Sequence, residues 1–203
     1  MRKSGRKSNN NFMCKALLIG GSAGSLNVLL KILPGLNKDL GFPIIIVLHR
    51  KPGKDSILTD ILSSKTLLHV KEVEEKEVIK NDTVYIAPPN YHLLFEENYT
   101  FALDASEKIN FSRPSIDVSF ESAAEVYKDH LTCLILSGAN TDGAQGMVYA
   151  AEHGAQTWAQ DPATAVVSVM PQSAIEIVKN IKIVQPEEIS LLINALASNL
   201  ESS

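Results

Sequence analysis

Lys15-Ala-Leu-Leu-Ile-Gly-Gly-Ser-Ala-Gly-Ser-Leu26 is the stretch of sequence from which the fold can be worked out. The apolar run at residues 16–19 predicts a buried strand, and apolar residues at helical spacing from Leu26 to Leu33 predict a helix directly after the glycines. Gly20-x-Ser22-x-Gly24 matches the nucleophile-elbow pattern, in which a tight strand-to-helix turn exposes a serine hydroxyl. Ser22 is therefore a candidate nucleophile, and the N–H groups that begin the helix, near Ala23 and Gly24, are candidates to stabilise an oxyanion.

A glycine-rich turn of this kind is also a common cradle for phosphate groups, and the turn alone leaves both alternatives open. A dinucleotide site is excluded, because the glycines at positions 20, 21 and 24 do not fit G-x-G-x-x-G. The acid expected about 20 residues further on, at the tip of the second strand, is also absent. His49 and Arg50 stand at that tip instead.

The rest of the chain alternates between strand-like and helix-like segments. Further strands are predicted at residues 43–49, 67–70, 131–136, 156–159 and 181–184, and helices at residues 55–62, 115–128, 144–152, 171–178 and 186–200. Residues 73–103 predict short strands at 78–80, 83–87, 93–96 and 100–103, in a hairpin-rich and mostly antiparallel insert or sheet edge. The fold class predicted is α/β: a doubly wound, mainly parallel sheet with helices on both faces and a small antiparallel hairpin segment.

Three residues with catalytic chemistry fall at the carboxyl ends of three predicted strands, where such sheets bind their ligands. Ser22 follows the first strand, His49 closes the second, and Asp142 lies in the loop after residues 131–136. Taken singly, His49 could be a half-buried structural histidine and Asp142 an ordinary Asp-Gly turn residue. Together they form a candidate triad in which His49 accepts the serine proton and Asp142 orients the imidazole. The remaining histidines, at positions 69, 92, 130 and 153, are expected to be structural or solvated.

Composition describes an ordinary globular protein of one domain, with 203 residues, 45% hydrophobic and 21% charged. We expect a disordered basic arm at residues 1–14 and a single catalytic domain at residues 15–203. Five basic residues precede any acid, which leaves a net charge of −9 after residue 15 and argues against nucleic acid as a partner. No signal peptide or apolar run of membrane-spanning length is present, and Cys14 and Cys133 are expected to be free buried thiols, so a cytoplasmic protein without membrane insertion is expected.

Six motifs in order resemble the catalytic domain of CheB-type chemotaxis protein-glutamate methylesterases, in register from about residue 15 to about residue 184. They are Ile19-Gly-Gly-Ser-Ala-Gly24, Val47-Leu-His49, Val84-Tyr-Ile-Ala-Pro88 followed by His92, Arg113-Pro-Ser-Ile-Asp117, Leu136-Ser-Gly-Ala-Asn-Thr-Asp-Gly143, and Ala159-Gln-Asp-Pro-Ala163 with Met170-Pro171. The resemblance implies that Ser22, His49 and Asp142 are the family's triad and that the substrate is a glutamate methyl ester in the methylated cytoplasmic region of a chemotaxis receptor. Some members also deamidate glutamine. Neither a metal nor an organic cofactor is expected.

The sequence departs from the family pattern in two stretches beside the expected site. Ser22-Ala-Gly-Ser25 replaces Ser-Thr-Gly-Gly, and Ser137-Gly-Ala-Asn140 replaces the Thr-Gly-Met-Gly that contributes to the oxyanion region. Backbone N–H groups survive such changes, but Ala139 is much smaller than methionine, so pocket shape and specificity are expected to differ. Arg113 is expected to line the substrate cleft and to pair with acids of the receptor.

Regulation and the exact activity are left open by the sequence. About fifteen residues precede the first strand, too few for the N-terminal receiver domain that family members often carry, so control from elsewhere or constitutive activity is expected. Two alternative functions remain. One is a catalytically impaired binding module of the same fold, and the other is a serine hydrolase that acts on another small ester or amide.

Overall fold

The computed structural model describes residues 12–50, 55–109 and 111–198. Its main sheet has seven strands, all parallel, in the order β3-β4-β2-β1-β7-β8-β9. A separate antiparallel pair, β5 and β6, lies beside it. The strands are β1 (Ala16–Gly21), β2 (Ile44–Leu48), β3 (His69–Glu72), β4 (Thr83–Ile86), β5 (His92–Phe95), β6 (Phe101–Asp104), β7 (Leu131–Ile135), β8 (Gln156–Gln160) and β9 (Lys182–Val184).

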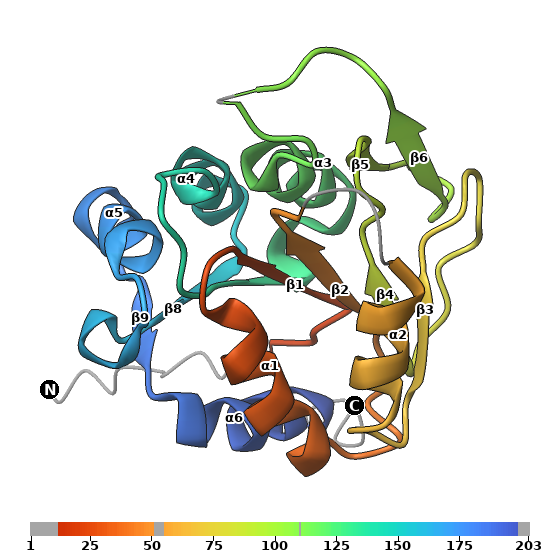
Figure 1. Cartoon of the computed structure of the whole chain (residues 1–203), viewed down its shortest axis with the longest axis horizontal. Helices are drawn as coiled ribbons and strands as arrows, with labels where there is room; N and C mark the ends of the chain where they lie inside the picture. Colours follow the sequence, from red (N-terminus) through yellow and green to blue (C-terminus); the bar gives the residue numbers. More distant parts are fainter. Residues whose placement is uncertain (1–11, 51–54, 110, 199–203) are drawn as a thin grey trace, which may run out of the picture.

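Helices cover both faces of the main sheet (Figure 1). On one face lie α1 (Ser25–Ile32), α2 (Asp55–Ser63) and α6 (Pro186–Ser198), whose apolar residues join one buried cluster. On the other face lie α3 (Ile116–Tyr127), α4 (Ala144–Glu152) and α5 (Val169–Ile177), whose apolar residues join a second cluster. The predicted doubly wound sheet with helices on both faces is thereby confirmed.

The central strands are apolar along their whole length because helices bury both of their faces. Every residue of β1, β2 and β7 is buried, which is the pattern of a parallel sheet covered on both sides. β1 lies between β2 and β7, and the chain continues outward from β1 in one direction and later from β7 in the other. The switch point of the sheet therefore falls between β1 and β7, where doubly wound folds bind ligands.

The prediction for residues 73–103 was wrong in two respects. β4 is not part of an antiparallel hairpin: it lies inside the main sheet and pairs in parallel with both β2 and β3. Residues 78–80 form no strand, and Val78 makes only an isolated bridge to Thr100. The antiparallel hairpin itself is confirmed as β5 and β6, while the strand predicted at 67–70 begins two residues later, at His69.

The described chain already packs against the domain before β1. Cys14 is fully buried, and the carbonyl oxygen of Met13 accepts a hydrogen bond from His130 Nδ1 at 2.9 Å. Both Cys14 and Cys133 are buried free thiols, as predicted. The basic residues of the predicted arm, within residues 1–11, lie outside the described residues. Among the helices that are described, none has the length and apolarity needed to cross a membrane.

Candidate active site

Parallel pairing brings the ends of β2, β1 and β7 together at one rim of the sheet. Gly21 pairs with Leu48, so the next residues on the two strands, Ser22 and His49, leave the sheet side by side. The backbone N–H of His49 donates to the carbonyl of Gly21 at 3.1 Å, which continues this pairing. On the other side, the N–H of Ser22 donates to the carbonyl of Ser137, at 2.9 Å.

The turn that carries Ser22 depends on two of its glycines. Gly24 has a φ of 87°, a left-handed conformation that residues with a side chain rarely adopt, and it caps the start of α1. At Gly20 a β-carbon would lie 2.5 Å from Ile116 Cγ2 and 3.0 Å from Ile135 Cδ1, so a larger residue would push α3 away from the sheet. The sequence stretch therefore forms the predicted strand-to-helix elbow.

His49 and Asp142 form a direct hydrogen bond, the feature that organises this site. His49 Nε2 lies 2.6 Å from Asp142 Oδ2. The His49 side chain is 13% exposed, whereas that of Asp142 is completely buried. Because Asp142 is a carboxylate acceptor, Nε2 carries the proton of a neutral imidazole and Nδ1 carries the lone pair.

The N-cap residue and the first turn of α3 hold the carboxylate of Asp142 by hydrogen bonds. Its carboxylate accepts hydrogen bonds from Ser115 Oγ (2.9 Å), Ile116 N–H (2.7 Å) and Asp117 N–H (3.1 Å). Burial by itself would raise the pKa of Asp142, but the hydrogen bond from His49 and those from the two backbone N–H groups outweigh burial, so the pKa lies below its ordinary value. The carboxylate is thus kept ionised beside the imidazole.

The link between Ser22 and His49 is not formed in this structure. Within the described residues, Ser22 Oγ makes no hydrogen bond. His49 Nδ1, the nitrogen that would take the serine proton, instead lies 3.4 Å from Asn140 Nδ2. Hydrogen bonds between catalytic groups are often long or absent before substrate binds, so adjacency in the sheet register remains the support for this pair.

Backbone N–H groups beside Ser22 have different availabilities. The N–H of Ser22 is taken by Ser137, and the N–H of Gly138 donates to the carbonyl of Val167 at 3.0 Å. In the part of the chain that the structure describes, no acceptor takes the N–H of Ala23 or of Gly24. These two groups are consequently the candidates to bind an oxyanion. Ala139, also a candidate from the sequence, is an exposed residue of the loop between β7 and α4.

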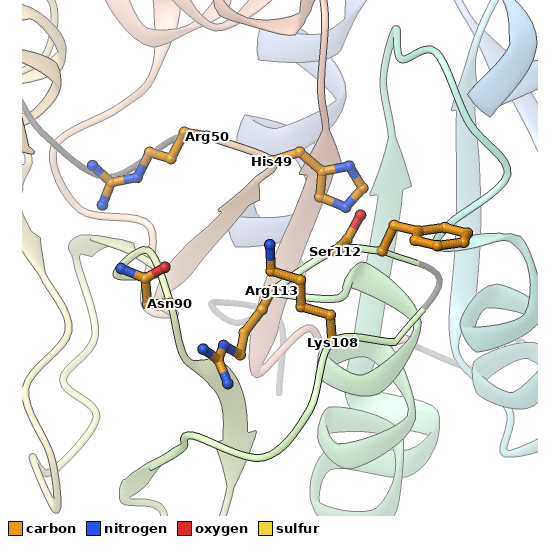
Figure 2. Close-up of a pocket in the computed structure, with 7 residues that line it drawn as sticks. His49, Arg50, Asn90, Lys108, Ser112 and Arg113 are labelled. Carbon is orange, nitrogen blue, oxygen red and sulfur yellow. The ribbon is translucent and has the colours of Figure 1, made fainter.

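A cleft of about 320 Å³ opens in front of His49 (Figure 2). It is lined from three segments: His49 and Arg50 after β2, Asn90 after β4, and the segment between β6 and α3. That last segment supplies Lys108, Phe111, Ser112 and Arg113. Phe111 is 98% exposed, an unusual position for a large aromatic ring. The cleft therefore combines positive charge with an aromatic side chain.

Arg113 lines this cleft and also holds the cleft wall, while its pairing with acids of a substrate stays a prediction. Its Nη1 donates to the carbonyls of Ala105, at 2.5 Å, and Ser106. Opposite it, Arg50 pairs with Glu72 at 2.5 Å and donates to the carbonyl of Ala87 at 3.1 Å. The described residues include no group of three or more His, Cys, Asp and Glu side chains placed to hold a metal ion.

The sequence assigns no catalytic role to the residues that surround the His49–Asp142 pair. His92 is buried: its Nδ1 accepts from the N–H of Ser115 at 3.1 Å, and its Nε2 contacts the carbonyl of Glu107 at 3.0 Å. Ser115 in turn caps α3 and donates to Asp142. The expectation that His92 is structural fits these contacts. The sequence signal for this support was the Arg113-Pro-Ser-Ile-Asp117 motif at the start of a helix.

Residues 17–193 match the family described as "CheB methylesterase". A protein of Leptospira interrogans, whose name gives protein-glutamate methylesterase and protein-glutamine glutaminase activities provisionally, is 47% identical over 188 residues, 92% of this chain and 97% of that protein. The Thermotoga maritima protein-glutamate methylesterase/protein-glutamine glutaminase is 41% identical over 165 residues, 80% of this chain and 48% of that protein.

A solved structure agrees with the sequence relatives. The crystal structure of the Thermotoga maritima CheB methylesterase catalytic domain superposes with a TM-score of 0.85 at 36% identity, covering 90% of this chain and 98% of that one. The family match, the relatives and the shared architecture give the same answer: the chain belongs to the CheB methylesterase family.

Proposed function

We propose that this hydrolase of the CheB methylesterase family cleaves γ-methyl esters of glutamate residues in the cytoplasmic region of chemotaxis receptors, using Ser22, His49 and Asp142. The observation that carries the proposal is the 2.6 Å hydrogen bond between His49 Nε2 and Asp142 Oδ2, with Ser22 leaving the neighbouring strand beside His49. This hydrogen bond fixes the tautomer of His49, the proposed base. His49 lies next to Ser22, the candidate nucleophile, at the rim where the sheet has its switch point.

The reaction follows from these positions. His49 Nδ1 takes the proton of Ser22 Oγ, and the oxygen attacks the ester carbonyl carbon, whose π electrons move to the carbonyl oxygen. The N–H groups of Ala23 and Gly24 bind this oxyanion. Collapse of the tetrahedral intermediate expels methoxide, which leaves as methanol with the proton from His49. Water then attacks the glutamyl-enzyme with His49 again as base, which releases glutamate and restores Ser22.

The same steps would deamidate glutamine, with ammonia leaving in place of methanol. Relatives named as both methylesterases and glutaminases support this second activity. The ionised Asp142 stabilises the imidazolium in each proton transfer, because its lowered pKa keeps it charged while His49 is protonated.

The cleft supports binding of an acidic segment of the receptor. Arg50, Lys108 and Arg113 place three cationic side chains around the approach to His49 in a protein whose net charge is −4. These cations attract a negatively charged peptide at short range. Salt screens the repulsion from the more distant acidic residues of the protein, so the local attraction dominates. Arg113 is thus proposed to pair with receptor carboxylates.

The test is methanol release from a receptor peptide that carries glutamate γ-methyl ester. Ser22→Ala is expected to abolish release, because the nucleophile is gone. Asp142→Asn is expected to lower kcat on the order of ten-thousandfold, because the imidazole loses its acceptor and its charge partner. Circular dichroism spectra of the variants control for folding.

Two results would separate the alternatives. Equal and negligible release by the wild type and Ser22→Ala would identify a binding module without catalysis. Release from a panel of other small esters or amides, with none from the receptor peptide, would identify a serine hydrolase of different specificity.

A further inference from the structure

Asn140 connects two of the proposed catalytic residues through its side-chain amide. It lies in the loop between β7 and α4, and it is half-buried. Its Oδ1 accepts the backbone N–H of Asp142 at 3.2 Å, and its Nδ2 lies 3.4 Å from His49 Nδ1. Since a backbone N–H can only donate, the oxygen of the amide must face Asp142 and the NH₂ group must face His49.

The position of this NH₂ group matters because of the tautomer of His49. Nε2 donates to Asp142, so Nδ1 is the nitrogen that must accept the proton of Ser22. A serine oxygen that gives its proton to Nδ1 lies within hydrogen-bonding distance of it, about 3 Å. The ester carbon that this oxygen attacks is bonded to the carbonyl oxygen that becomes negative, so we expect that oxygen to lie within reach of the amide of Asn140.

We infer that the side-chain NH₂ group of Asn140 donates a hydrogen bond to the oxyanion, alongside the backbone N–H groups of Ala23 and Gly24. This inference rests on the proposed ester cleavage by Ser22. It makes Asn140 a fourth catalytic residue, in a loop where Ala139 has no side chain beyond its β-carbon to occupy the adjacent space.

The approach of the Ser22 hydroxyl to His49 would itself release this donor. In the resting state, Nδ1 is the acceptor nearest to the NH₂ group, and the 3.4 Å separation makes the contact weak. Nδ1 has a single lone pair, so the Ser22 hydroxyl displaces the amide when it comes within hydrogen-bonding distance, and after proton transfer Nδ1 is a donor that can no longer accept from Asn140. The amide has therefore lost its acceptor by the time the carbonyl oxygen gains negative charge, and its NH₂ group can donate to the oxyanion instead.

Asn140→Asp separates the two contacts of the side chain. An aspartate keeps an oxygen for the N–H of Asp142 but, when ionised, has no hydrogen to donate. Its kcat for methanol release from the methylated receptor peptide is expected to fall on the order of a hundredfold, the loss typical of one missing oxyanion donor, with KM nearly unchanged. Asn140→Ala is expected to lose a similar factor. Thr141→Ala, at the exposed neighbouring position, is the matched control and should retain wild-type kcat.

A second measurement distinguishes a catalytic donor from a residue that only holds the loop. The Nε2 proton of His49 in its short hydrogen bond to Asp142 is expected to give a far-downfield proton NMR resonance. The resonance should persist in Asn140→Ala, because that bond does not involve the amide. Loss of the resonance together with kcat would overturn the inference, since Asn140 would then act only by positioning Asp142.

The remaining outcomes are equally decisive. A kcat within about threefold of the wild type in both Asn140 variants overturns the inference. A higher kcat also overturns it, and would mean that the amide of Asn140 blocks His49. Full methanol release by Ser22→Ala would instead defeat the proposed function itself. The Ser22→Ala result thus tells the two failures apart.

Discussion

At the scale of single residues, the pKa values of two neighbouring carboxyl groups are shifted in opposite directions. Asp142 stays ionised because His49 and the start of α3 donate to it. Asp117, in the first turn of α3, donates its N–H to Asp142, is buried, and accepts from the N–H of Gly146 at 2.7 Å. Burial raises its pKa to about 6, and the negative charge of Asp142 adds to the rise. The charge of Asp142 is therefore maintained at the expense of Asp117.

Replacing Asp117 by asparagine is expected to stabilise the protein at high pH. The folded pKa of about 6 lies above the ordinary value of 3.8, so the unfolded chain loses its proton first and the stability of the wild type falls as pH rises from about 4 to about 6. Asp117→Asn removes this cost, and the free energy of unfolding should increase by up to about 3 kcal/mol at pH 8 and hardly at pH 4. Urea denaturation at both pH values measures it.

The control for this prediction is Asp129→Asn, at an exposed position just after α3, which should change stability little at either pH. Equal free energies of unfolding for the wild type and Asp117→Asn at pH 8 would contradict the raised pKa.

Sequence could predict the residues of the site whose place depends on strand order alone. Ser22, His49 and Asp142 each follow an apolar strand, and parallel strands end at a common rim, so their proximity was predictable. Asn140 was part of a recognised motif but received no role, because only the fold shows that its amide lies between His49 and the backbone of Asp142. Side-chain direction in a loop has no periodicity to read.

At the scale of elements, α3 approaches β1 so closely that a β-carbon added at Gly20 would clash with it. Gly20 lies under Ile116, and Phe120 Cζ would be 3.1 Å from a β-carbon placed there. The same helix supplies the N–H groups that hold Asp142. The packing of α3 on β1 therefore fixes the N–H groups that hold the carboxylate of Asp142.

Gly20→Ala is expected to destabilise the protein by about 1–3 kcal/mol, the usual cost of forcing extra volume into a packed core. The cost should be smaller in an Ile116→Ala background, because the β-carbon then enters vacated space. Urea denaturation of the wild type, the two single variants and the double variant gives the coupling energy. The same cost in both backgrounds would show that Ile116 is not the obstacle.

Element prediction succeeded for the long apolar strands and failed where the pairing partner of a strand had to be chosen. The apolar runs of β1, β2 and β7 indicated buried parallel strands. β4 was assigned to the hairpin segment because turn residues surround it, although all four of its residues are buried in the main sheet. Strand partners are set by long-range packing, which short turn signals do not report.

At the scale of the whole molecule, the cleft in front of His49 is positively charged although the protein as a whole is acidic. The protein is acidic, with a net charge of −4, yet Lys108 and Arg113 border the cleft in front of His49. Figure 2 shows both side chains on the wall opposite the end of β2. Such an arrangement favours the approach of an anionic peptide to this face alone.

Arg113→Gln is expected to raise KM for an acidic methylated receptor peptide by about two- to fivefold, the range of an exposed ion pair, with a smaller change in kcat. Arg113→Lys keeps the charge and should retain more of the affinity. Raising the salt concentration should increase the wild-type KM and narrow the difference between the variants.

Lys179→Gln is the control, because this exposed lysine precedes β9 at the opposite end of the strands. An unchanged KM in Arg113→Gln at low salt would remove Arg113 from substrate binding and leave it only the carbonyls of Ala105 and Ser106.

The contacts of Ser137 have a consequence for anyone who recombines this protein with its relatives. Its carbonyl holds the N–H of Ser22, and its hydroxyl donates to the carbonyl of Ala23 at 2.7 Å and accepts the N–H of Val167 at 2.9 Å. Three loops from distant parts of the gene product thus share one small side chain. A chimera that exchanges only one of these loops would lose part of this hydrogen-bond set. The three loops should therefore be exchanged together.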